Sequence, residues 1–123
     1  MTINEAITRC DNLKPNQYCV EDKIRWISDL DGIIKKELID AHEGGEAIPF
    51  SGYDSASDRD AELLAGDPYS ELYIKYLFAQ IDFHNAEFTR YNNSMIMFNV
   101  AYAAYADYYN RTVLPRQQNA LSI

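Results

Sequence analysis

Cysteine and histidine are scarce in this chain, since each occurs only twice in 123 residues. Cys10 and Cys19 are too few for a disulfide framework or a complete zinc set, and we expect thiols in a reducing compartment. No base lies near Cys19 in the sequence, and Cys10 falls on the apolar side of an expected helix. His42 suits the end of a helix, and His84 suits a packing position. The sequence therefore predicts no catalytic, cofactor-binding or metal site.

Long apolar runs and a basic leader are also lacking. No segment of about 18 residues is free of polar side chains, and the chain opens Met-Thr-Ile-Asn-Glu without a basic region followed by an apolar one. We therefore expect neither membrane insertion nor secretion, and we expect the protein in the cytoplasm of the cell that makes it. The length suits a single domain with its own core.

Basic residues are few, with 11 against 19 acidic ones, and the imbalance is local. Residues 40–67 hold eight acids and one arginine, so this interval contributes −7 of the net charge of −8, while the flanking segments are near neutral. No basic surface suited to binding nucleic acid is indicated. Helical periodicity also disappears within this interval. We therefore predict a long acidic loop over 44–67, with a functional role or order gained on binding.

The acidic loop does not match a calcium-binding loop. Asp54, Asp58 and Asp60 have the spacing of three EF-hand ligands, but Arg59 stands where glycine is needed and Ala65 where a bidentate glutamate is needed. We interpret these three aspartates, together with neighbouring Tyr53, as candidates for contact with another molecule.

Helical patterns fill the rest of the chain and predict an all-α bundle. Thr2 and Glu5 form a capping-box pattern, Gly44-Gly45 is a natural helix end, and Asp67-Pro68 is a typical helix start. The expected elements are helices over about 2–13 and 20–43, one long helix or two stacked helices over about 68–112, and a flexible tail over 113–123.

A heptad stripe runs through the C-terminal helical region and predicts one continuous packing seam of about 60 Å. Residues 95–106 are apolar almost all round, which predicts that this stretch is the most buried part of the fold. The stripe consists of Ile74, Leu77, Ile81, His84, Phe88, Tyr91, Met95, Phe98, Tyr102, Tyr105 and Tyr109.

Tyrosine is abundant, and eight of the ten lie between Tyr69 and Tyr109. Tyrosine is common at interfaces because it combines a large apolar area with a polar end. Tyr73, Tyr76 and Tyr108 lie off the stripe, so we predict that they contact another chain. The segment after residue 110 has two arginines and no acid, which makes Arg111 and Arg116 further candidates.

Several segments resemble a family of small head-tail connector, or adaptor, proteins of tailed phages and prophages of Firmicutes. The strings Glu-Asp-Lys-Ile-Arg-Trp (21–26) and Tyr-Asn-Asn-Ser-Met (91–95) are the more specific ones. Cys19 departs from the serine expected there, and the C-terminal tail shares no pattern with the family. The resembling segments are 16–32, Gly-Tyr-Asp (52–54), Glu-Leu-Leu (62–64), Pro-Tyr (68–69), Gln-Ile-Asp (80–82) and 91–99.

The resemblance implies a helical structural protein that forms a homo-oligomeric ring beneath the portal protein, joins the head to the tail and helps retain packaged DNA. Expected partners are other copies of the chain, the portal and a downstream tail or stopper protein, with DNA passing through without sequence-specific binding. The location would be the host cytoplasm during assembly and then the head-tail junction of the virion. We expect the acidic loop to contact a neighbour or to line the DNA channel, where its charge would repel phosphates.

Two other classes stay open at this point. A soluble acidic inhibitor that mimics DNA, of the anti-restriction type, would carry its acids on helix surfaces, but the predicted helices here are close to neutral. A small hydrolase or metal enzyme would need a cluster of reactive side chains that two histidines and two cysteines do not supply.

Overall fold

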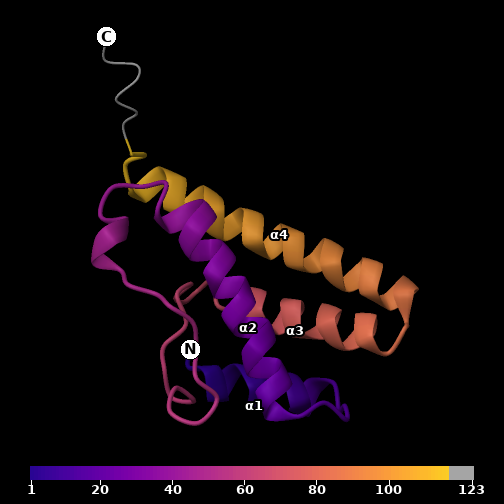
Figure 1. Ribbon diagram of the computed structural model, residues 1–123. Coiled ribbons are helices and arrows are strands. Elements are labelled where there is room, and N and C mark those ends of the chain that lie inside the picture. Colours follow the sequence, from indigo (N-terminus) through magenta and orange to yellow (C-terminus); the bar gives the residue numbers. More distant parts are fainter. Residues whose placement is uncertain (117–123) are drawn as a thin grey trace.

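The computed structural model describes residues 1–116, and this part of the chain contains four α-helices (Figure 1). They are α1 (Ile3–Leu13), α2 (Val20–Ile34), α3 (Glu71–His84) and α4 (Phe88–Thr112); a π-helical turn, η1 (Lys35–Ile39), continues α2, and a 3-10 turn, η2 (Gly45–Ala47), follows it. Within the described residues the only β-type pairings are two isolated antiparallel bridges, Thr2 with Glu62 and His42 with Pro115. The all-α prediction is confirmed.

Local signals in the sequence correctly predict how α1 begins. The Glu5 amide donates to Thr2 Oγ1 at 3.2 Å, and the Thr2 amide donates to Glu5 Oε1 at 3.2 Å, which completes the capping box. Cys10 lies on the buried face of α1, as predicted. Cys19 is the N-cap of α2, but its side chain makes no capping hydrogen bond.

The C-terminal helical region is an antiparallel hairpin, not one long rod. Helices α3 and α4 lie side by side and are joined by a tight turn at residues 85–87 (Figure 1). At this turn the Glu87 amide donates to the Asp82 carbonyl at 2.9 Å, and the Ala86 amide donates to the Phe83 carbonyl at 3.0 Å. These two bonds form a Schellman motif, whose left-handed residue is Ala86 (φ 58°). The prediction of a continuous seam of about 60 Å is therefore wrong, because the chain reverses direction after His84.

Replacing Ala86 with glycine should raise the free energy of unfolding by roughly 0.5–1 kcal/mol, because glycine adopts the left-handed conformation without a Cβ clash. Urea unfolding followed by circular dichroism measures this change. Ala86→Val is the matched control, since a β-branched residue at positive φ should destabilise the same turn. Equal stability of the two variants would contradict the assignment of strain to this residue.

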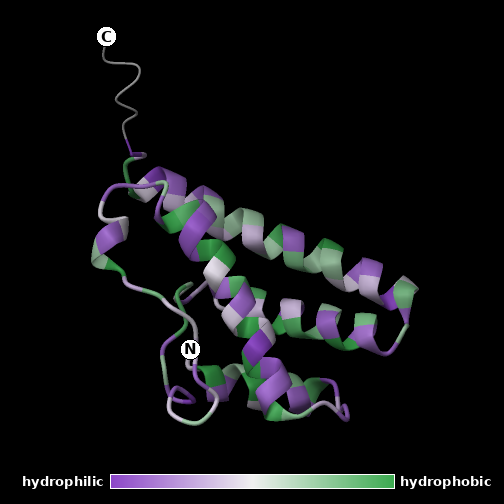
Figure 2. Ribbon diagram, in the orientation of Figure 1, coloured by the Kyte–Doolittle hydropathy of each residue, from purple (hydrophilic) through white to green (hydrophobic). Residues whose placement is uncertain are grey.

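Helix α3 lies at the centre of the fold, because it contacts α1, α2 and α4, whereas α4 packs chiefly against α3. Seven of its residues are buried: Leu72, Tyr73, Ile74, Leu77, Ala79, Ile81 and Asp82. Helix α4 buries only Phe98 and Tyr105, and its ribbon is green or pale along much of its middle (Figure 2). The prediction that residues 95–106 are the most buried stretch is therefore wrong.

The segment that follows η1 is hydrogen-bonded to the segment that follows α4. The regular helix stops at Ile34, and η1 carries the chain to Ile39, short of the predicted residue 43. The Glu43 amide donates to the Leu114 carbonyl at 2.8 Å, and the Arg116 amide donates to the Ala41 carbonyl at 2.9 Å. Residues 114–116 of the predicted flexible tail are therefore paired with residues 41–43; residues 117–123 lie outside the described part.

The segment between η2 and α3 contacts the N-terminal end of α1 and contains no regular helix. The amides of Ile3 and Asn4 donate to the carbonyls of Ala61 and Arg59 at 3.1 and 2.9 Å, and Leu63 and Ala65 enter the core. These bonds satisfy amides of the first turn of α1, which lack partners inside the helix. Helix α3 begins at Glu71, three residues after the predicted Pro68.

Candidate interaction surfaces

Within residues 1–116, no group of three or more histidine, cysteine, aspartate or glutamate side chains could hold a metal ion. In the same residues, no helix is both long and apolar enough to cross a membrane. Burial raises the pKa of the Cys10 thiol to about 12, so this thiol is uncharged at neutral pH. Cys19 is exposed.

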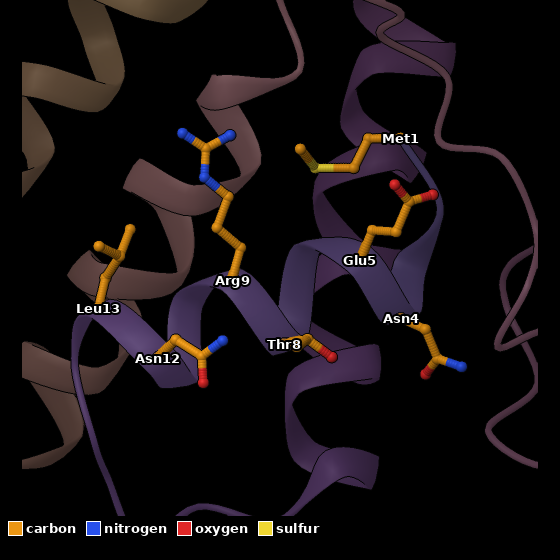
Figure 3. A pocket seen from close by; sticks show the side chains of 7 residues that line it. All are labelled: Met1, Asn4, Glu5, Thr8, Arg9, Asn12 and Leu13. Carbon is orange, nitrogen blue, oxygen red and sulfur yellow. The ribbon is translucent and has the colours of Figure 1, made fainter.

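An open depression lies along α1, and Figure 3 shows its lining side chains. The charged groups in it already have structural roles, because Glu5 belongs to the capping box and Arg9 pairs with Glu71 of α3. Leu13 at one end is 62% exposed. The depression holds no convergent set of polar groups of the kind that orients a small ligand.

Tyr73 is completely buried in the core, so the prediction that it contacts another chain is wrong. Its hydroxyl donates to Asp31 Oδ1 at 2.5 Å and accepts a hydrogen bond from the Ala65 amide at 2.8 Å. Asp31 Oδ2 also accepts hydrogen bonds from the Tyr53 hydroxyl and from the Leu64 amide, the latter at 3.2 Å. One buried carboxylate thus joins α2 and α3 to the segment between η2 and α3.

The titration of this cluster follows from burial. Burial raises the pKa of Asp31, and hydrogen bonds from Tyr53, Tyr73 and Leu64 lower it in part. Burial and the facing Asp31 carboxylate raise the pKa values of Tyr53 and Tyr73, so both tyrosines are hydrogen-bond donors at neutral pH.

The other tyrosine candidates differ in exposure. Tyr53 is half-buried and is held by Asp31. Tyr76 is half-buried, with its ring centroid 5.1 Å from that of Phe98. Tyr108 is 40% exposed, and its ring lies 4.9 Å from that of Tyr69. Of the tyrosines predicted to contact another chain, Tyr108 therefore presents the most accessible ring.

The aspartates predicted to contact a partner also build the local turn. Asp54 Oδ1 accepts hydrogen bonds from the amides of Ala56 and Ser57 at 2.8 and 3.0 Å, which lower the pKa of Asp54. Asp58 Oδ2 accepts from the Asp54 amide at 2.7 Å, and Asp60 accepts from the Asn4 side chain at 3.4 Å. The carboxylates of Asp54 and Asp60 lie on exposed residues. The turn therefore keeps a negative surface while its acids fix its shape.

The two predicted arginines lie near the C-terminal end of α4. Arg116 pairs with Glu46 of η2 at 2.8 Å, and both side chains are more than half exposed. Arg111 is exposed in the last turn of α4. The ion pair between Arg116 and Glu46 therefore adds to the backbone hydrogen bonds between residues 41–43 and 114–116. Arg111 faces solvent.

The sequence analysis did not predict that α4 has an exposed apolar surface. The side of α4 that faces away from α3 carries Ile96, Met97 and Val100, which are 61%, 53% and 68% exposed, followed by exposed Ala103 and Ala104. We call these five residues the α4 outer face. The sequence did indicate that this surface needs a partner, because a helix that is apolar all round must be covered on every side. In the structure α4 has a single main neighbour, so its far side stays exposed.

A second exposed apolar surface lies at the turn between α3 and α4. Phe83 and Phe88 are 47% and 57% exposed, and the Phe83 ring lies 6.1 Å from that of Phe88 and 5.3 Å from that of Tyr91. We call these three residues the hairpin tip. Beside it, the exposed ring of His84 stacks on Trp26 at 5.1 Å with an angle of 8° between planes. His84 thus packs through one ring face against α2, although its side chain is exposed and the continuous seam on which it was predicted does not form.

Neighbouring exposed apolar side chains are typical of surfaces that bind other macromolecules. No family model, no curated protein and no solved structure matches this chain.

Proposed function

We propose that this chain is a subunit of the head-tail connector of a tailed phage or prophage, assembled as a ring beneath the portal. The observation that carries the proposal is the exposure of large apolar side chains at two separate places, the α4 outer face and the hairpin tip. A ring requires a heterologous interface, in which one face of a subunit binds a different face of the next. The resemblance of residues 16–32 and 91–99 to connector proteins supports the same function.

The turn that carries Asp54, Asp58 and Asp60, which we call the acidic turn, is suited to line the DNA channel or to contact a basic neighbour in such a ring. Asp54 has a lowered pKa and is exposed, so it is charged at neutral pH. Exposed carboxylates along a channel repel DNA phosphates and keep the genome from adhering to the wall. Tyr108 and Arg111, near the C-terminal end of α4, would meet the portal or a downstream tail or stopper protein.

The first experiment is quantitative mass spectrometry of purified particles, with the major capsid protein as the internal standard. A low, fixed copy number close to that of the portal is the expected result. Absence from intact particles, with abundant protein in the infected cytoplasm, would refute a connector and would fit the soluble inhibitor described above.

A second experiment tests the hairpin tip in particle assembly. Phe88→Asp should strongly reduce joining of filled heads to tails, because a charge in an apolar contact is costly to bury. Leu13→Asp is the matched control, since Leu13 is similarly exposed but lies at the end of α1. Normal particle yield with Phe88→Asp would exclude the hairpin tip from the connector interfaces.

A further inference from the structure

We propose that the free chain forms a two-fold symmetric dimer through α4, in which the α4 outer face packs antiparallel against the same face of a second copy. This inference goes beyond the connector function, because it concerns the chain before any assembly with other proteins. Three observations support it: the composition of the face, its spacing, and the charges at its two ends.

The face has the composition of a helix–helix interface. Met97 and Val100 stand at its centre with more than half of each side chain exposed, and Ile96 flanks them. Exposed Ala104 follows one turn later, and a small side chain permits close approach of a second helix. Helix α4 makes its main contacts with α3 on the opposite side, so no other helix covers this face within residues 1–116.

The spacing of the exposed residues is that of a coiled-coil seam. Arg90, Asn93, Met97, Val100, Ala104 and Asp107 alternate steps of three and four, and each of them is exposed. Such a seam packs against another seam of the same period as knobs into holes. From Arg90 to Asp107 the seam is about 25 Å long.

The charges at its ends select the antiparallel orientation. An antiparallel pair centred between Phe98 and Asn99 places Met97 opposite Val100 of the second copy. The same register places Arg90 opposite Asp107 of the second copy at both ends, so two opposite-charge pairs close the contact. A parallel pair would instead bring Arg90 beside Arg90 and Asp107 beside Asp107, which is unfavourable.

The intramolecular partners of these charges are compatible with the contact. Arg90 forms an ion pair with Glu87 at 3.0 Å, but its side chain is 71% exposed and can turn toward a second copy. Within residues 1–116, no ion pair engages Asp107. The contact is isologous and closes at two copies, so it cannot itself generate a ring. In a connector, where we propose that the α4 outer face takes part in the ring interface, this dimer would have to open first.

The test measures the mass of the purified full chain by light scattering and sedimentation. A dimer is expected at about 100 μM, which lies above the dissociation constants of moderately stable dimers. Val100→Asp should raise the dimer dissociation constant at least about tenfold, because it places a charge in the centre of the contact. Leu13→Asp, which alters a residue of similar exposure outside the face, should leave the dimer unchanged. Circular dichroism checks that both variants fold.

Charge reversal distinguishes the proposed register from other contacts. Arg90→Asp alone and Asp107→Arg alone should each weaken the dimer, because both ends become like-charge pairs. Mixing the two variants should restore dimers. At one end of the mixed pair the two substituted side chains, an aspartate and an arginine, face each other, and at the other end the native Asp107 of one copy faces the native Arg90 of the other.

A monomeric native chain at this concentration would overturn the proposal and leave the face to a different partner. Failure of the mixed variants to pair would overturn the antiparallel register. Neither result bears on the copy number of the chain in particles, so the dimer and the connector function are tested independently.

Discussion

Replacing Asp31 with alanine should lower the free energy of unfolding by about 3–5 kcal/mol, because several buried groups lose their acceptor at once. The Tyr73 hydroxyl is buried and would have no acceptor in place of Asp31 Oδ1, and the Leu64 amide would lose Oδ2. Tyr53 is only half-buried and can turn to water. The loss thus comes mainly from the donors on α3 and on the segment before it.

Urea unfolding at one fixed protein concentration measures this loss, since association would otherwise add to the apparent stability. Asp29→Ala is the matched control, because Asp29 lies on the same helix but is exposed, and a change within about 0.5 kcal/mol is expected. Asp31→Asn should lie between the two, since its amide keeps one acceptor oxygen. If Asp31→Ala costs no more than Asp29→Ala, the carboxylate does not hold the fold together.

The raised pKa of Asp31 adds a dependence on pH. The native state binds the proton of this carboxyl more tightly than the unfolded chain does. Its contribution to stability is therefore fully present below the unfolded-state pKa, which is about 3.9, and is lost as the pH rises through the native pKa. The native chain should gain stability relative to Asp31→Asn when the pH is lowered from 7 toward 4. An unchanged difference would contradict the raised pKa.

Replacing Lys14 with methionine should lower the free energy of unfolding by about 2–4 kcal/mol, because it leaves the Asp82 carboxylate buried without a counter-charge. Lys14 Nζ lies 2.6 Å from Asp82 Oδ1, and Asp82 is only 1% exposed. Its other oxygen accepts a hydrogen bond from Ser94 Oγ at 2.8 Å. One carboxylate thus links the end of α1 to α3 and α4 beside the turn that joins them.

Lys75→Met is a close control for this change. The ammonium groups of Lys14 and Lys75 lie 5.8 and 5.9 Å from the centre of the same Phe78 ring, so both variants lose a similar cation–π contact. Only Lys14 also pairs with Asp82, and the difference between the two variants isolates that ion pair. Adding Asp82→Asn to Lys14→Met should recover more than about 1 kcal/mol, and strict additivity of the two changes would contradict direct coupling.

Structural features that depend only on residues close together in the sequence were predicted best. The capping box of α1 needs only Thr2 and Glu5, and the sequence shows both. The turn between α3 and α4 was missed because its left-handed residue is Ala86, and the usual signal at that position is glycine. The heptad stripe did not reveal the reversal, because periodicity gives the apolar face of each helix but not the direction of the chain between two helices.

Features that depend on the position of each helix in the bundle were predicted least well. Tyr73 lies off the stripe, but α3 is enclosed by three other helices, so its flank is as buried as its stripe. Conversely, Val100 lies in the most apolar stretch of the chain and is 68% exposed because α4 is peripheral. Periodicity gives the faces of a helix, but the number of its neighbours decides how many of those faces are covered.

The pairing between residues 41–43 and 114–116 has a consequence for the order of folding. Contacts between α3 and α4 are close in the sequence and need little loop closure, whereas His42 and Asn110, which meet beside this pairing, are 68 residues apart. We therefore expect the hairpin to form early and the pairing to form last. In native-state hydrogen exchange the Glu43 and Arg116 amides should open first, while the amides in the middle of α3 should exchange only through global unfolding. The pairing between residues 41–43 and 114–116 would then open and close many times before the core around α3 unfolds once.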